Sequence, residues 1–291
     1  MSNKFNKGVP LKEILSSLSI NSTLDSDRVI VGISDSAKSE ANTLCDYVKG
    51  PLPENLPGLV LLTKEPIIGF DCVIVKNPQE EIIKIISYIT SSVGFKKRYK
   101  DSVIPGSVTI GKNVVIEDDV EIGEGTVIEH NVVIHSGTRI GKNCLIRTHS
   151  SIGGGGFNYV TTETGLTKLP DLGGVDIGDD VEIGSNTCIV KGLINDTVIK
   201  QGVKIDNLVH IAHDCFIDEG AFIIASAEVS GYVSIGKRSR IAPGSVVKQR
   251  VKIGDDVVVG MGAVVFKNIA DGLVVVGNPA KPLRQLSKNK D

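Results

Sequence analysis

Residues 104–152 read IPGSVTIGKNVVIEDDVEIGEGTVIEHNVVIHSGTRIGKNCLIRTHSSI, and an isoleucine returns at every sixth position from Ile104 to Ile152. The rhythm resumes at Ile177 and, after a four-residue slip, runs from Ile199 to Val265, which makes 24 hexads in all. Gly, Asn and Asp gather between the aliphatic positions, where corners need residues that tolerate unusual dihedral angles. A period of six indicates a short strand plus a turn, because a helix repeats every 3.6 residues. Hexapeptide repeats of this kind form parallel β-helices.

Three hexads per coil would build a three-sided prism, so 24 hexads predict a mainly β fold of about eight coils. With stacked strands ~4.8 Å apart, the prism would be roughly 40 Å long. Its narrow interior suits stacked Ile and Val better than large rings, which agrees with the absence of Trp and the 4% aromatic content of the 291 residues.

We expect three parts along the chain. Residues 1–100 lack the six-residue repeat, and their pattern predicts a small α+β domain. We expect helices over residues 11–18 and after Pro78, and strands over residues 29–33, 58–62 and 72–75. Residues 101–268 form the β-helix domain, and residues 269–291 form a C-terminal tail. A loop over residues 153–176 interrupts the prism and is either a flexible exit or a flap over a substrate.

Composition excludes several function classes. Lys and Arg number 32 against 34 Asp and Glu, so a net charge of −2 argues against nucleic acid or an anionic membrane as partner. The five cysteines are scattered without zinc-like spacing, which indicates reduced thiols. The absence of zinc-like spacing also predicts a protein without a metal. With no secretory signal and no long apolar run, we expect a cytoplasmic protein without membrane insertion.

Two of the five histidines lie in the segment KIDNLVHIAHD over residues 204–214. His213 follows the inward-facing Ile211 by two places, so it should stand at a corner of the prism. Gly231 lies 18 residues on, one full coil, so its backbone should stack one strand spacing from the imidazole. Either Asp214 or Asp206 would orient the ring.

An imidazole beside a glycine N–H suits acyl transfer to an amine. The imidazole accepts the amine's proton near neutral pH while the amine attacks a thioester. The glycine N–H can then stabilise the negative charge that develops on the carbonyl oxygen.

Several segments resemble UDP-3-O-acylglucosamine N-acyltransferase, the hexapeptide-repeat family of lipid A synthesis, over residues 8–260. They are VIVKNP at 73–78, GFNY at 156–159, KLP at 168–170, VDIGDDVEIGSN at 175–186 and KIDNLVHIAHD at 204–214. The resemblance implies a left-handed coil, His213 as general base, Gly231 at the oxyanion position, a uridine-binding role for the small domain, and a homotrimer with sites between prisms.

The chain also departs from that family. Arg250 stands where the family has a second histidine, and the family's uracil-binding aromatic pair has no clear counterpart near residues 44–50, although Tyr47 lies close by. The ending VGNPAKPLR over residues 276–284 resembles coenzyme-A-dependent sugar-nucleotide transferases, which implies that Lys281 and Arg284 contact coenzyme A. We therefore favour acyl-CoA over acyl-carrier protein as the donor.

The sequence thus predicts an N-acyltransferase that acylates the amine of a nucleotide-linked amino sugar for cell-surface polysaccharide or lipopolysaccharide synthesis. His213 and Gly231 would be catalytic. The substrate would be contacted by Asn207, His210, Phe157, Tyr159, Arg250 and Tyr47. Three alternatives stay open: the lipid A enzyme with an acyl-carrier-protein donor, a γ-carbonic-anhydrase-type zinc enzyme using His130 and His135, and a non-catalytic prism.

Overall fold

The computed structural model describes residues 3–22, 24, 27–36, 38–48, 52–97, 101–162 and 165–285. The chain divides into two compact units. The N-terminal unit comprises Met1–Lys97 and Phe157–Leu172, and the prism unit comprises Arg98–Gly156 and Gly173–Asp291. Within the described ranges, no helix has the length and apolar character needed to cross a membrane.

The N-terminal unit contains a five-stranded sheet in the order β1-β2-β3-β4-β5, parallel except for the antiparallel pair β1–β2. Its elements are β1 (Lys4–Pro10), α1 (Leu11–Ser17), β2 (Val29–Ile33), β3 (Thr43–Asp46), β4 (Val60–Thr63), β5 (Asp71–Ile74) and α2 (Pro78–Ser92). Helix α2 begins with a proline, whose fixed φ and missing N–H suit the first turn. Its predicted isoleucine stripe is buried and contacts β3 and β4.

The sequence reading missed β1 and β3. Strand β1 reads KFNKGVP and β3 reads TLCD, and neither has the Val- and Ile-rich run that marks β2, VIVGI. The interrupting loop also differs from expectation, because it contains an antiparallel hairpin of β14 (Tyr159–Thr162) and β15 (Gly165–Lys168). Strand β14 contacts α2, which places this hairpin in the N-terminal unit.

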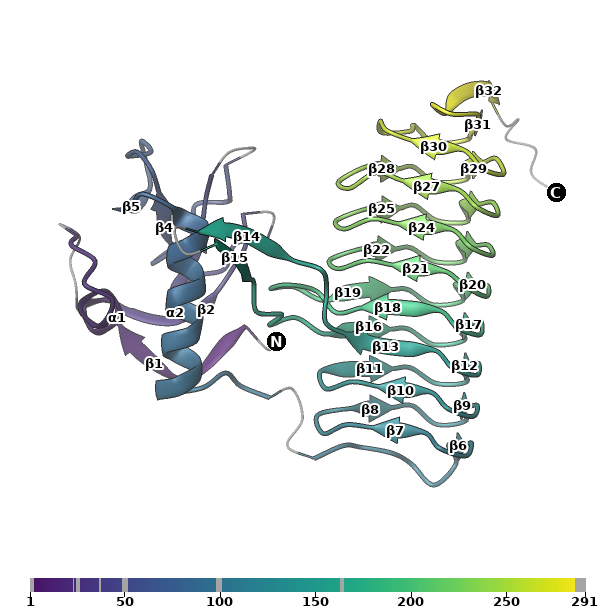
Figure 1. Ribbon diagram of the computed structural model, residues 1–291, viewed down its shortest axis with the longest axis horizontal. Helices are drawn as coiled ribbons and strands as arrows, with labels where there is room; N and C mark the ends of the chain where they lie inside the picture. Colours follow the sequence, from purple (N-terminus) through teal and green to yellow (C-terminus); the bar gives the residue numbers. More distant parts are fainter. Residues whose placement is uncertain are drawn as a thin grey trace. The chain divides into compact units, whose positions relative to one another are not determined.

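The prism unit is a parallel β-helix with three faces, whose coils run from β6 to β31 (Figure 1). The eight-stranded face, called face F, contains β7 (Val115–Ile116), β10 (Val133–Ile134), β13 (Ser151–Gly154), β18 (Cys188–Val190), β21 (His210–Ile211), β24 (Glu228–Val229), β27 (Val246–Val247) and β30 (Val264–Val265). The seven-stranded face, called face D, contains β8 (Glu121–Ile122), β11 (Thr138–Ile140), β16 (Val175–Ile177), β19 (Thr197–Ile199), β22 (Phe216–Ile217), β25 (Ser234–Ile235) and β28 (Lys252–Ile253).

The third face, called face E, contains ten strands. They are β6 (Thr109–Ile110), β9 (Val127–Ile128), β12 (Leu145–Ile146), β17 (Glu182–Ile183), β20 (Lys204–Ile205), β23 (Phe222–Ile223), β26 (Arg240–Ile241), β29 (Val258–Val259), β31 (Leu273–Val276) and the antiparallel β32 (Lys281–Gln285). The predicted mainly β, parallel β-helix is confirmed, and its coil count differs slightly from eight because the faces carry unequal numbers of strands. Strand β31 adds a rung inside the segment that we expected to be a tail.

Strand pairing follows the hexads. Ile211 pairs with Val229 one coil on, and the usual offset is 18 residues. The offset rises to 37 residues where Ile140 pairs with Ile177 across the hairpin insertion. It rises to 22 residues where the four-residue slip falls. The aliphatic column therefore keeps its place despite both interruptions.

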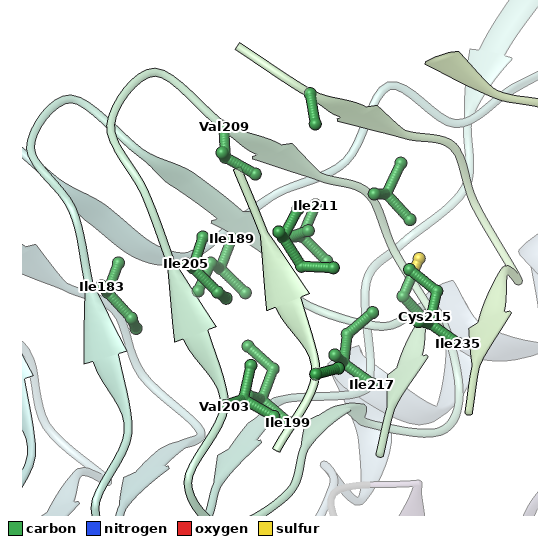
Figure 2. Packing of buried hydrophobic residues seen from close by; sticks show 14 of the residues in the cluster. Ile183, Ile189, Ile199, Val203, Ile205, Val209, Ile211, Cys215, Ile217 and Ile235 are labelled. Atoms are coloured by element: carbon green, nitrogen blue, oxygen red, sulfur yellow. The ribbon is translucent and has the colours of Figure 1, made fainter. Parts of the chain in front are cut away.

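The prism has one continuous hydrophobic core. Each hexad contributes two inward side chains to it, an Ile or Val and a second residue that is usually smaller. Figure 2 shows Ile183, Ile189, Ile205 and Ile211 pointing inward from neighbouring strands. Several inward hydroxyls bond to backbone carbonyls, as Ser150 does to Gly184 over 2.7 Å, whereas those of Thr138 and Thr197 have no hydrogen-bond partner among the described residues. Such bonds allow small polar residues to alternate with aliphatic ones inside a dry core.

Candidate active site

His213 stands at the corner between β21 and β22, where the backbone turns from face F to face D. The sequence places it there because Ile211 must point inward and the next inward residue is Cys215. The side chain of His213 is 12% exposed, so the imidazole is shielded yet open to a small reactant.

Asp214 holds the imidazole in place. Its Oδ2 lies 2.9 Å from Nδ1 of His213 and also accepts the N–H of Leu193 over 3.0 Å. The Asp206 carboxylate instead accepts the N–H groups of Asn207 and Ala225. The structure thus selects Asp214 between the two acids that the sequence left open.

This contact determines the tautomer of His213. A carboxylate only accepts hydrogen bonds, so the proton of the neutral ring is on Nδ1 and the lone pair is on Nε2. The side chain of Asp214 is 4% exposed, and its Oδ1 has no hydrogen-bond partner among the described residues. A buried anion in contact with the ring is well placed to stabilise the imidazolium that forms when Nε2 takes up a proton.

Gly231 stacks on the imidazole, as the 18-residue spacing predicts. A Cβ built on Gly231 would lie 2.6 Å from both Cε1 and Nε2 of His213, closer than real side chains approach. Only glycine therefore leaves room for the ring in this position. Gly231 is buried, and among the described residues its N–H donates no hydrogen bond.

Tyr232 is a neighbour of the imidazole that the sequence reading missed. Its ring meets that of His213 edge-on, with centroids 5.1 Å apart and an interplanar angle of 89°. The guanidinium of Arg250 lies 4.1 Å from the centroid of the Tyr232 ring. His213, Tyr232 and Arg250 therefore pack in a row along this corner. Tyr232 has a φ of 60°, unusual for a bulky residue. An aromatic residue at a position where many other corners have Asn or Asp was the available signal.

Asn207 lies at the other end of β21 from His213, at the corner between faces E and F. Its Oδ1 accepts the N–H of Ser185 over 2.7 Å. It borders a hollow of about 540 Å³ on face E, together with Arg147, Glu182, Lys204, Asp206 and Phe222. His210 begins β21, one residue before the inward-facing Ile211. Contact of Asn207 and His210 with substrate remains a prediction.

Three predicted substrate contacts belong to the N-terminal unit. Phe157 and Tyr159 pack against each other with ring centroids 5.1 Å apart, and Phe157 is 91% exposed. Tyr47 follows β3 and donates its N–H to the carbonyl of Leu62. Their roles in binding substrate also remain predictions.

The C-terminal end of the prism has an apolar hollow of about 360 Å³. Phe266, Leu273, Val275, Pro279 and Lys281 are among the residues that line it. Arg284, three residues further along β32, is exposed and pairs with Val274. Of the two predicted contacts with coenzyme A, Lys281 borders this hollow.

The two histidines proposed for a zinc site make separate contacts. Nδ1 of His130 accepts the N–H of Lys112 over 2.8 Å, and Nδ1 of His135 lies 2.9 Å from Oε1 of Glu117. In the part of the chain that the structure describes, no group of three or more His, Cys, Asp or Glu side chains is arranged to hold a metal ion.

The family model described as bacterial transferase hexapeptide (six repeats) matches residues 119–154 and 232–267. Both matched stretches lie in the prism unit. His213 lies between the two matched stretches.

Curated relatives that the chain matches in part are N-acyltransferases by name. The chain is 36% identical over 131 residues to a UDP-3-O-acylglucosamine N-acyltransferase of Delftia acidovorans, covering 44% of this chain and 39% of the relative. It is 39% identical over 139 residues to the protein of that name from Hahella chejuensis, covering 47% and 40%. The chain thus matches about two fifths of the length of these relatives.

Solved structures share the hexapeptide-repeat fold. LpxA from Acinetobacter baumannii superposes with a TM-score of 0.55 at 25% identity, covering 64% of this chain and 73% of that one. The UDP-N-acetylglucosamine acyltransferase of Francisella novicida gives a TM-score of 0.56 at 26% identity, covering 64% and 70%.

Proposed function

We propose that this protein is an N-acyltransferase that moves an acyl group from a thioester to the amine of a nucleotide-linked amino sugar. The observation that carries the proposal is the pairing of the Asp214-held imidazole of His213 with the Gly231 amide one coil away. The names of the curated relatives, which are N-acyltransferases of an acylated glucosamine, support the same class of reaction.

The geometry suggests a stepwise reaction. The amine nitrogen attacks the thioester carbonyl carbon, and Nε2 of His213 takes up the proton that the nitrogen loses. The Gly231 N–H donates to the resulting oxyanion, a contact worth roughly 3 kcal/mol in other enzymes. The C–S bond then breaks, the thiolate leaves with the proton from Nε2, and an amide remains on the sugar. Asp214 stabilises the imidazolium between these two proton transfers.

For the donor we propose acyl-CoA. The hollow bordered by Lys281 offers an apolar surface beside a cation, which suits the pantetheine arm and phosphates of coenzyme A. The relatives' name, UDP-3-O-acylglucosamine N-acyltransferase, and the resemblance to that family favour a second candidate, in which an acyl-carrier protein supplies the acyl group. Rates with acyl-CoA and with acyl-carrier protein, each against UDP- and dTDP-amino sugars, discriminate the two.

The catalytic assignment is tested by His213→Ala, with His149→Ala as the matched control. His149 is another corner histidine of the prism, and its Nε2 contacts the Asn131 amide. We expect His213→Ala to lower turnover by a factor of ~10² to 10⁴ with unchanged folding, because it removes the general base. Near-normal turnover in His213→Ala would refute the assignment.

A homotrimer is also proposed, and sedimentation equilibrium of the full chain tests it.

A further inference from the structure

A second polar cluster lies on face F, away from His213. Oε1 of Glu117 is 2.9 Å from Nδ1 of His135, and Nε2 of His135 is 3.3 Å from Oγ of Ser151. Glu117 and His135 follow β7 and β10, whose strands are paired in register, and Ser151 begins β13 on the next coil. Three coils therefore contribute an acid, an imidazole and a hydroxyl in linear order.

The contacts determine where the protons are. Because the Glu117 carboxylate can only accept, Nδ1 of His135 carries the ring proton of the neutral imidazole. Nε2 then accepts the hydrogen bond from the Ser151 hydroxyl. The same carboxylate accepts the N–H of Ser136 over 2.9 Å, and this bond lowers the pKa of Glu117; partial burial acts in the opposite direction, and the contact with His135 lowers the pKa further. The acid consequently stays charged, as an orienting carboxylate must.

Space for a reacting group exists beside the hydroxyl. A Cβ built on Gly154 would lie 3.5 Å from Oγ of Ser151 and 3.6 Å from Nε2 of His135, both ordinary contact distances. An atom in this position touches the hydroxyl and the imidazole together without a clash. The side chains of His135 and Glu117 are 28% and 45% exposed, so the cluster is open to solvent.

Other corner histidines of the prism lack this arrangement. Nδ1 of His130 accepts a backbone N–H, and Nε2 of His149 contacts an asparagine amide. Those contacts connect neighbouring coils and need no hydroxyl. Only His135, among the histidines of the described ranges, links a carboxylate at one ring nitrogen to a serine at the other.

We propose that Ser151, His135 and Glu117 form a second acyl-processing site, in which Ser151 is a nucleophile toward small esters or thioesters. His135 and His213 both follow strands of face F, on rungs three steps apart, which corresponds to roughly 14 Å. This site is therefore separate from the His213 corner. The geometry is that of nucleophile, base and orienting acid found in serine hydrolases.

The reaction balances with water as the only co-reactant. The Ser151 oxygen attacks the acyl carbonyl carbon, and its proton passes to Nε2 of His135. The bond from carbon to the alcohol or thiol breaks, and the leaving group departs with that proton. Water then attacks the acyl-serine, giving its proton to His135, which returns it to Ser151 as the carboxylic acid leaves.

A fluorophosphonate probe on the full-length protein tests the nucleophile, with the labelled residue located by peptide mass spectrometry. We expect Ser151 to be labelled at least about tenfold faster than any other serine, and His135→Ala to reduce that rate at least about tenfold. Glu117→Gln should reduce it severalfold. His149→Ala and Ser185→Ala, a corner serine bonded to Thr148 rather than to a histidine, should leave it unchanged.

Hydrolysis of p-nitrophenyl acetate and of acetyl-CoA identifies the leaving group. Loss of either activity in Ser151→Ala supports the site and assigns it to esters or to thioesters. Ser151→Cys keeps a nucleophile if the alanine variant fails to fold, and its alkylation should then depend on His135. No labelling of Ser151, or labelling that His135→Ala leaves unchanged, overturns the proposal. These assays contain no amine acceptor, so their outcome is independent of the proposed transfer.

Discussion

Gly231→Ala tests the central contact of the candidate active site. Gly231 does not have a positive φ, so alanine fits its backbone, and the added methyl group is the only perturbation. That methyl would lie 2.6 Å from Cε1 and Nε2 of His213, whereas ordinary contact begins at 3.4 Å. The ring must therefore retreat by roughly 0.8 Å, the difference between these distances.

The ring has little freedom to make that retreat. Nδ1 is held 2.9 Å from Asp214, and the Tyr232 ring packs edge-on against the imidazole. A movement of this size is enough to take an N–H···O contact beyond its usual range of about 2.7–3.2 Å. Misplacing a reacting group by ~1 Å costs about a hundredfold in rate, so we expect kcat/KM to fall by ~10². The strain should lower the free energy of unfolding by about 1–3 kcal/mol.

The assay is the initial rate of acylation of a UDP-amino sugar by acyl-CoA or acyl-carrier protein, whichever donor is active. Thermal unfolding followed by circular dichroism gives the stability of each variant. Gly106→Ala is the matched control, because Gly106 is in the same prism without a positive φ and a methyl group added there would meet nothing within 4 Å. Gly231→Ala activity within twofold of wild type would show that close stacking of the imidazole and the glycine is not needed.

Three further predictions follow from the prism and its corners. Ile211→Ala should lower the free energy of unfolding by about 2–5 kcal/mol, measured by urea denaturation, because Ile211 is fully buried in a column that cannot collapse around a cavity. Burial raises the pKa of the Cys215 thiol to about 12, so iodoacetamide should leave Cys215 unmodified at about pH 8 until the protein unfolds. The Ser136 N–H is the main cause that holds the pKa of the Glu117 carboxyl below its usual 4.5. The ionised carboxylate therefore stabilises the folded protein above that pH, and this stabilisation is lost as pH falls through the lowered pKa. The melting temperature of wild type should therefore drop further than that of Glu117→Gln between about pH 6 and pH 3, and parallel curves would contradict this.

The β-helix could be predicted because its determinant is local and repeated. Each hexad, such as GKNVVI at residues 111–116, carries both its inward aliphatic residue and its turn residues, and 24 copies average out single exceptions. The small N-terminal sheet could not be read as well. Strands β1 and β3 lack the Val- and Ile-rich runs that indicated the other strands of the sheet.

One contact of the candidate site could be predicted because it too depends on the regular repeat of the coils. A coil of constant length places Gly231 against His213, so counting 18 residues was sufficient. The choice of Asp214 over Asp206, and the contact of Tyr232, depend on side-chain directions at a corner. The link between Ser151 and His135 was hidden too, because their 16-residue separation is not a whole coil.

By itself, then, the order of residues determined which side chains point inward, how the coils stack and which glycine meets which imidazole, since a six-residue period repeats the same backbone geometry. Tertiary structure alone decided which carboxylate holds His213, which serine meets His135, and that the hairpin of β14 and β15 belongs to the N-terminal unit. The physical reason is that these contacts depend on rotamers and on packing between segments distant in the chain, for which no periodicity exists to be counted.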